Sequence, residues 1–194
     1  SLNRLALEGT LTGINVPTDR NIKLMPYVLG NNNKVINETS YSESEGDFGL
    51  DAKVGVTSSL TMDITYNTDF AQVEADEQQV NLDRFSLFFP EKRAFFLENA
   101  GLFSAGENTY YGPDIEMFFS RRIGIVSGSR VPILGGGRLT GDLGGFKLGI
   151  LNMRTGSVKN VSDGDDYGVF RLKKELPNRT YFGGMITRKK GLGD

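Results

Sequence analysis

The sequence predicts an all-β protein, in which antiparallel strands follow one another as a meander and form a transmembrane-type β-barrel or a fragment of one. Three observations predict this fold: stretches of alternating polarity recur along the chain, turn-forming residues separate them, and no helical period of useful length is present. Each stretch has about the 9–11 residues that a bilayer-crossing strand needs. The whole chain, 1–194, is expected to form one domain, and an aromatic-rich insert is expected at 68–114.

The clearest strands lie in a hairpin around Ser58-Ser59. Apolar residues alternate with polar ones in both arms, at Phe48, Leu50, Ala52, Val54 and Val56 and then at Leu60, Met62, Ile64 and Tyr66. This pattern predicts one apolar and one polar face. In a membrane barrel the apolar faces would contact lipid. The opposite faces would line the lumen, with Asp51, Lys53, Asp63, Arg171 and Lys173 among their residues.

The remaining elements are assigned by the same criteria. Further strands are predicted at 4–12, 21–29, 115–122, 131–140, 144–154, 165–175 and 180–189, with Pro26 placing 21–29 at an edge or a bulge. Residues 31–45 are polar and predict a loop. Turns are predicted at Gly141-Asp142, Asp163-Gly164 and Pro177-Asn178, and a short helix or turn within 70–80. The glycines at 135–137 favour a sharply bent strand, as at a barrel corner.

Composition excludes several classes of protein. The net charge of −2 gives no basic footprint, so a nucleic-acid partner is not expected. The absence of His and Cys removes the commonest general base and the commonest transition-metal ligands. We therefore expect no catalytic residues, no metal and no cofactor, and more generally a protein that is not an enzyme.

The insert is the unusual segment. The stretch 85–103, FSLFFPEKRAFFLENAGLF, holds six of the thirteen Phe residues around a charged turn. Core packing against a sheet explains the rings. A plug-like segment inside a barrel would also need partners for its charges. The predicted charge network that pins this plug comprises Asp83, Arg84, Glu91, Lys92, Arg93, Glu98, Arg121 and Arg122. Tyr110, Tyr111, Phe118 and Phe119 are candidates for a lipid–water girdle or for ordinary packing.

Several stretches together resemble a family: DFAQVEAD (69–76), QQVNLDRFSLFFPEKRAFFLENAGLF (78–103), FFSRRIG (118–124), PILGGGRLTGDLGGFKLGIL (132–151) and YGVFRLKKEL (167–176). They resemble the large bacterial outer-membrane β-barrel family of unknown function that lies downstream of carbohydrate-binding family 9-like modules. The resemblance implies a bacterial outer-membrane barrel and supplies no catalytic residues. Because that family's barrel is longer, we expect this chain to be an incomplete barrel.

Three functional hypotheses follow. The first is an outer-membrane barrel with outer-membrane lipid as its partner and a role in transport, surface glycan binding or scaffolding. The second is an extracellular protein that self-associates through unpaired strand edges into oligomers or fibres. The third and weakest is a glycan-processing hydrolase that uses Glu91 and Glu98 as a carboxylate pair.

Overall fold

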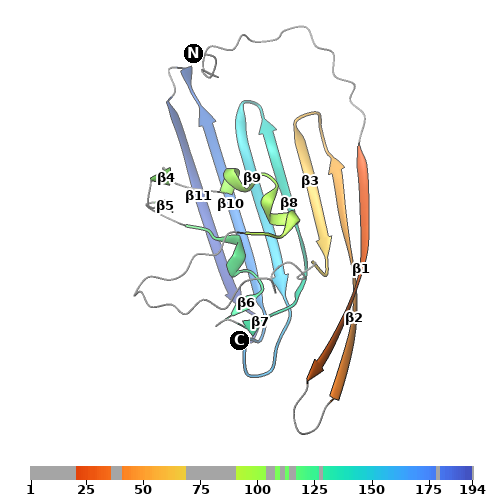
Figure 1. Cartoon of the computed structure of the whole chain (residues 1–194). Helices are drawn as coiled ribbons and strands as arrows, with labels where there is room; N and C mark the ends of the chain where they lie inside the picture. Colours follow the sequence, from red (N-terminus) through yellow and green to blue (C-terminus); the bar gives the residue numbers. More distant parts are fainter. Residues whose placement is uncertain are drawn as a thin grey trace.

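The computed structural model describes residues 21–35, 41–68, 91–103, 108–109, 112–113, 117–126, 129–177 and 180–193. Within these ranges, seven strands form one antiparallel sheet (Figure 1). In spatial order they are β1 (Ile22–Val35), β2 (Tyr41–Gly55), β3 (Leu60–Tyr66), β8 (Ile133–Leu143), β9 (Phe146–Thr155), β10 (Asp165–Glu175) and β11 (Tyr181–Gly191). The predicted antiparallel all-β fold is therefore confirmed.

The elements between β3 and β8 are short. They are the helix α1 (Ala94–Leu97), the 3₁₀ turns η2 (Ala100–Phe103) and η3 (Ser120–Arg122), and two ribbons made of β4 (Asn108–Thr109) with β5 (Gly112–Pro113) and β6 (Ile125–Val126) with β7 (Ser129–Arg130). No helix in the described ranges is both long and apolar enough to cross a membrane.

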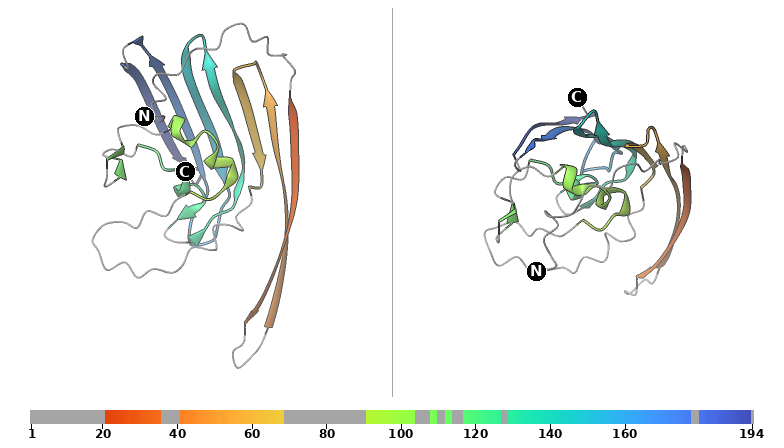
Figure 2. Two further views of the ribbon diagram at one scale, coloured as in Figure 1. Left: turned by 45° about the horizontal axis from the view of Figure 1, so that its top comes forward. Right: turned by 90° about the horizontal axis from the view of Figure 1, so that it is seen from above.

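The sheet is open within the described part of the chain. Sequence neighbours pair with each other except that β3 pairs with β8 across the insert, and β1 and β11 are the two edges. The view from above shows that the sheet bends as an arc, with α1 and η2 inside its concave side (Figure 2). A closed barrel is not formed by these strands alone.

Most of the predicted strands match observed ones, and 165–175 coincides with β10. Pro26 lies in β1, at an edge as expected. Three predictions were wrong. The loop at 31–45 is largely strand, because Asn31–Val35 pairs in register with Tyr41–Glu45. The segment 115–122 is not a strand where it is described, since η3 occupies its end. The elements expected at 4–12 and 70–80 lie outside the described residues.

The third wrong prediction is a turn. Gly141 and Asp142 belong to β8, and the chain reverses at Gly144-Gly145, where φ is +60° and +79°. Positive φ at both central residues is the geometry of a type I′ hairpin, which glycine adopts without steric cost. Asp142 Oδ1 accepts a hydrogen bond from the Gly145 backbone N–H at 2.9 Å. Asp142 therefore stabilises the turn from the end of the strand.

Strand register divides the sheet into two faces. Directly paired residues lie on the same face, and successive residues alternate between faces. The row Lys23, Lys53, Asp63, Arg138, Leu151, Val169 and Thr187 crosses all seven strands on the concave face. The neighbouring row Ile22, Val54, Met62, Leu139, Ile150, Phe170 and Ile186 crosses them on the convex face. By the same register, all five residues predicted for the polar face lie on the concave side.

The hydrophobic core lies between the insert and the concave face of β8–β10. It contains Phe95, Phe96, Phe103, Ile123, Ile133, Leu151, Met153 and Val169. Phe95 and Phe96 meet edge to face, with ring centroids 5.1 Å apart. Burying each ring contributes about 1.5–3 kcal/mol relative to exposure. The described rings of the stretch 85–103 therefore serve core packing.

Gly149 on β9 lets the insert approach the sheet closely. A Cβ atom at this position would lie 2.9 Å from Leu102 Cδ2 and 3.1 Å from Phe103 Cε1. Both distances are shorter than ordinary van der Waals contact. The missing side chain of Gly149 therefore makes the space that η2 occupies.

Candidate functional site

The segment directly before α1 is fixed by a buried ion pair, which we call the Arg93 clamp. Arg93 Nε donates to Glu91 Oε1 at 2.8 Å, and Nη2 donates to Oε2 at 2.7 Å. The same guanidinium donates to the backbone oxygens of Ile123 (2.7 Å) and Ser120 (2.8 Å) and lies 4.2 Å from the centroid of the Phe96 ring. Bidentate hydrogen bonds between arginine and a carboxylate are among the strongest hydrogen bonds in proteins. It joins the segment before α1 to η3 and the residue after it.

Glu91 is held in its ionised form. Burial alone would raise the pKa of its carboxyl group, but the hydrogen bonds and charge of Arg93 and the hydrogen bond from Ser120 outweigh burial, so the pKa lies below its usual value. Ser120 Oγ donates to Glu91 Oε2 at 2.6 Å. A general acid of a glycosidase needs a raised pKa instead. The arrangement suits Glu91 to a structural role.

A second ion-pair group, which we call the Arg138 clamp, joins the other end of α1 to the sheet. Arg138 on β8 is 3% exposed, and its Nη2 lies 2.7 Å from Asp63 Oδ2 on β3. Its Nη1 donates to the backbone oxygens of Phe95, at 2.6 Å, and of Glu98. Lys53 on β2 pairs with both Asp63, at 3.4 Å, and the Glu98 side chain. Because the last carbonyls of a helix lack intrahelical donors, Arg138 satisfies groups that the fold would otherwise leave unpaired.

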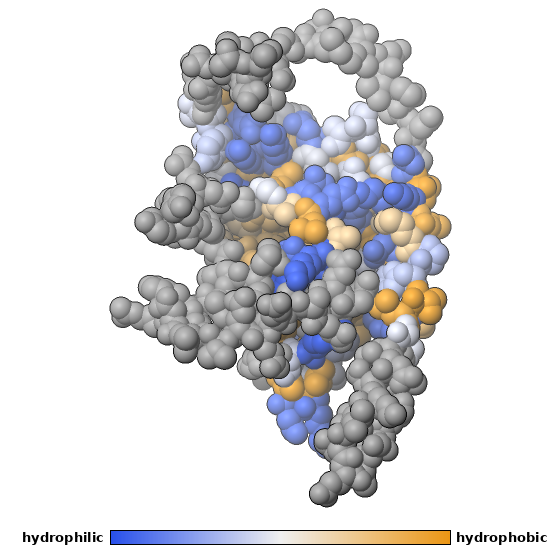
Figure 3. All heavy atoms as spheres, in the orientation of Figure 1, coloured by the Kyte–Doolittle hydropathy of each residue, from blue (hydrophilic) through white to orange (hydrophobic). Residues whose placement is uncertain are grey.

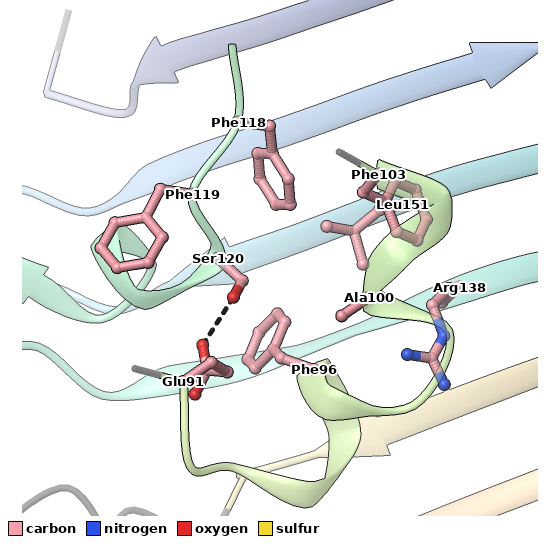
Figure 4. A pocket seen from close by; sticks show the side chains of 9 residues that line it. All are labelled: Glu91, Phe96, Ala100, Phe103, Phe118, Phe119, Ser120, Arg138 and Leu151. Atoms are coloured by element: carbon pink, nitrogen blue, oxygen red, sulfur yellow. Dashed lines mark hydrogen bonds between the residues drawn. The ribbon is translucent and has the colours of Figure 1, made fainter. Parts of the chain in front are cut away.

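An aromatic cavity of about 200 Å³ lies between the two clamps (Figure 4). Figure 4 shows the rings of Phe96, Phe103 and Phe118 around one space, with the Glu91–Ser120 hydrogen bond at its edge. The lining residues are Glu91, Phe96, Ala100, Phe103, Phe118, Phe119, Ser120, Arg138 and Leu151. This lining is mainly apolar, and it includes one charged residue from each clamp, Glu91 and Arg138.

The predicted charge network is partly assembled. Glu91 and Arg93 pair with each other, whereas Glu98 pairs across the sheet. Lys92 is half-buried and its backbone N–H donates to Glu91 at 3.1 Å. Arg121 is buried in η3, where burial lowers the pKa of its guanidinium, and Arg122 is exposed. Asp83 and Arg84 lie outside the described residues.

The sequence reasoning missed Arg138 and did not connect Lys53 and Asp63 to the insert. The alternating pattern predicted only that Lys53 and Asp63 lie on the lumen-facing side of the hairpin. The sequence offered one indication of this contact. The charged residues Asp63 and Lys53 on a strand face need partners of opposite charge if they are buried, and Arg138 is the charged residue directly after Gly135–Gly137.

The convex face carries many exposed apolar side chains. Its exposed strand residues are Ile22, Leu24, Val28, Phe48, Leu50, Met62, Ile64, Tyr66, Leu143, Ile150, Phe170, Phe182 and Ile186. Val28 is 83% exposed and Ile186 is 68% exposed, so the described chain leaves this face uncovered. Scattered exposed apolar residues are normal, whereas large contiguous apolar patches commonly mark interaction surfaces.

Aromatic pairs lie at both ends of this surface. Phe48 and Tyr66 have ring centroids 6.2 Å apart at one end, and Phe146 and Phe182 have centroids 6.5 Å apart at the other. Lys174 Nζ lies 4.3 Å from the centroid of the Phe146 ring. The candidates chosen from sequence differ: Phe118 and Phe119 line the cavity on the concave side, and Tyr110 and Tyr111 lie outside the described residues.

On the convex face, the apolar residues of β1–β3 and those of β9–β11 lie at different positions along the strands. The row of Leu24 on β1 continues through Ile64 on β3 and ends at Asn152 and Arg188 on β9 and β11. In the next row, Arg154 and Asp166 form an ion pair at 2.7 Å. The apolar part of β9–β11 thus lies toward the Phe146 end, and that of β1–β3 toward the Phe48 end.

Comparison with known proteins gives one match. The model of a family described as a domain of unknown function, DUF5916, matches residues 18–132, which include β1 to β7 and the insert and end just before β8. No curated protein and no solved structure matches the chain. The match agrees with the family resemblance in giving a family of unknown function, and it carries no statement about a membrane or a ligand.

Proposed function

The chain belongs to the DUF5916 family, and from this premise we propose that it forms part of the wall of a bacterial outer-membrane β-barrel with a non-catalytic role. In this proposal the convex face contacts lipid, the concave face lines the lumen, and the insert folds against the lumen side. Strands that pair with β1 and β11 complete the barrel. The role is transport, surface glycan binding or scaffolding.

The observation that carries the proposal is the opposite character of the two faces. On the convex side, apolar residues extend over seven strands and end in aromatic pairs at both borders. Membrane barrels have such an apolar band between aromatic girdles. On the concave side, the surface above the insert is hydrophilic (Figure 3). A soluble sheet of this kind would bury its apolar face in a core, whereas here the core lies on the other face.

The two clamps support a non-catalytic insert. Arg93 is 2% exposed and holds both carboxylate oxygens of Glu91, and Arg138 with Lys53 engages Glu98. Carboxylates engaged by arginine and lysine in this way help to hold the segment in place. This favours a plug-like or wall-supporting segment over a hydrolase.

The experiment uses the absence of Trp and the alternation of faces on β11. The chain contains no Trp, so a single introduced Trp is the sole indole fluorophore. Ile186 is convex and Thr187 is concave, and both are exposed neighbours on the same strand. We expect Ile186→Trp to be quenched strongly by lipids brominated on the acyl chains and Thr187→Trp to be quenched weakly.

Equal quenching of the two variants, or none in either, would contradict a lipid-facing convex surface. Extraction from cell membranes that requires detergent, with gel mobility that changes on heating, is the expected behaviour of the unaltered chain. Release into detergent-free buffer as a monodisperse species would also count against the proposal.

A second candidate function rests on the two free edges. Within the described residues, neither β1 nor β11 has a partner on its outer side, and such edges can pair with another copy. An extracellular assembly would then grow edge to edge. Sedimentation velocity in detergent-free buffer distinguishes it, because assembly gives sedimentation coefficients that rise with protein concentration. A constant monomer value across concentrations would exclude this candidate.

A further inference from the structure

A cavity beside η2 has a different character from the aromatic one. It has a volume of about 400 Å³ and lies on the concave side of β9–β11, where it is lined by Asn99, Gly101, Leu102, Lys147, Arg171, Lys173 and Tyr181. Its size is within the range of small-molecule sites. We call it the cation pocket, because three of its lining side chains are cationic.

The cations of this pocket are not balanced by the described chain. Lys147 and Lys173 are direct cross-strand partners on β9 and β10, an arrangement in which like charges repel. Both lie near the same oxygen, Glu175 Oε1, at 2.9 and 3.1 Å. Arg171 is two residues before Lys173 on the same face. It is half-buried and makes no ion pair or hydrogen bond with any described residue. Two of the three cations therefore share one carboxylate.

An arginine that has no partner among the described residues and that lines a cavity is suited to bind an anion. Its planar guanidinium can donate two parallel hydrogen bonds to a phosphate or a carboxylate. The two lysines would add charge from the neighbouring positions, and neutralising them would relieve their repulsion. Tyr181, whose ring lies 4.4 Å from Lys173 Nζ, gives the pocket an aromatic wall. Asn99 adds an amide, although its Nδ2 already donates to Thr140 Oγ1 at 3.1 Å.

We propose that the cation pocket binds the anionic group, a phosphoryl or carboxylate group, of a small polar solute. Arg171 makes the bidentate contact, and Lys147 and Lys173 contribute charge. The wall formed by η2 on one side and Tyr181 on the other holds the remainder of the solute. This site does not depend on whether the convex face contacts lipid, so the two proposals fail separately.

The test is calorimetric titration of the folded full-length chain at about 0.15 M ionic strength, where exposed charges are largely screened. The probes are inorganic phosphate, glucose 6-phosphate and glucuronate, with glucose as the neutral match. We expect at least one anion to bind and glucose not to bind under the same conditions. Binding of phosphate alone assigns the site to free anion, and tighter binding of glucose 6-phosphate or glucuronate assigns it to an anionic sugar.

Variants identify the residue that is responsible. Arg171→Gln is expected to weaken anion binding by about 10-fold or more, the effect of losing charge-assisted hydrogen bonds. Arg171→Lys keeps the positive charge but lacks the planar guanidinium that makes two parallel hydrogen bonds, so intermediate affinity is expected. Lys190→Gln, on the convex face of β11, removes the same charge and should leave binding unchanged. Circular dichroism confirms that each variant is folded.

Two results would overturn the proposal. The first is the absence of binding of all three anions to the unaltered chain up to millimolar concentration. The second is binding that Arg171→Gln and Lys190→Gln weaken equally, which would show that net charge alone attracts the anion. Neither result bears on the lipid contact tested with Ile186→Trp and Thr187→Trp.

Discussion

Arg138 and Asp63 form an ion pair across the junction of β8 and β3, with Nη2 and Oδ2 2.7 Å apart and both side chains buried. These strands are separated in sequence by the whole insert. The same Arg138 also donates to backbone oxygens at the end of α1. One side chain therefore stabilises the pairing of the two halves of the sheet and the attachment of the insert to it.

Removing Arg138 should loosen the insert. Arg138→Met leaves the Phe95 and Glu98 backbone oxygens without the Arg138 donor and leaves Asp63 with Lys53 as its remaining charged partner. Breaking a buried ion pair by removing one partner costs roughly 3–5 kcal/mol. We expect a lower free energy of unfolding in denaturant titrations and faster proteolysis within 91–103. The double variant Asp63→Asn with Arg138→Met removes both charges and should recover part of the loss. If the double variant is no more stable than Arg138→Met, the ion pair is not the cause.

The Arg93 clamp should make stability depend on acid pH. Because the pKa of Glu91 is lowered in the folded chain, the clamp contributes its full stability above the unfolded pKa of about 4.5. That contribution is lost as the pH falls through the lower folded value. Glu91→Gln should remove this component and reduce stability at neutral pH by roughly 1–3 kcal/mol. Denaturant titrations from pH 7 to pH 3 measure both effects, and identical pH profiles for the two proteins would rule out the assignment.

A side chain at Gly149 should displace the insert. Gly149→Val places atoms where η2 packs, and overpacking of this kind costs about 1–3 kcal/mol. Gly184→Val is the matched control, since a Cβ at Gly184 meets nothing within 4 Å. Thermal unfolding and protection of the insert against proteolysis give the comparison. Equal behaviour of the two variants would mean that η2 does not depend on this close approach.

Charge on the convex face should prevent folding into lipid. Ile186→Arg puts a cation on the proposed lipid-facing surface, where arginine near the bilayer midplane costs about 2–4 kcal/mol. Thr187→Arg carries the same charge on the concave face and should fold normally. Heat-modifiable gel mobility after incubation with vesicles reports folding. If both variants fold with equal yield, the convex face of β11 does not contact hydrocarbon.

The sequence predicted the strands whose side chains alternate in polarity, because this pattern follows directly from exposure of the two faces. β10 and the hairpin of β2 and β3 are examples. It did not predict the strand character of Asn31–Val35, because backbone pairing with Tyr41–Glu45 decides that segment and its own composition favours a loop. It misplaced the turn after β8, because Gly141-Asp142 has turn chemistry but Gly144-Gly145 has the required dihedral angles.

The candidate site was predictable only in part, for a related reason. Glu91 and Arg93 are near in sequence, and both were among the predicted charges. Asp63 and Arg138 are 75 residues apart, and only strand order brings them together. The cation pocket likewise depends on the register that sets Lys147 opposite Lys173. The spacing of residues within one strand does not show which residues of a neighbouring strand they contact.

The offset of the convex rows has a geometric consequence. The exposed apolar side chains of β1–β3 and those of β9–β11 lie at different positions along the strands. A planar apolar layer that contacts both groups must therefore run at an oblique angle to the strands. In a sheet that closes into a barrel, the strands are tilted by about 35–45° relative to the barrel axis. The oblique course of the apolar belt is the arrangement that inclined strands of a barrel would present, although the seven described strands by themselves leave the barrel open.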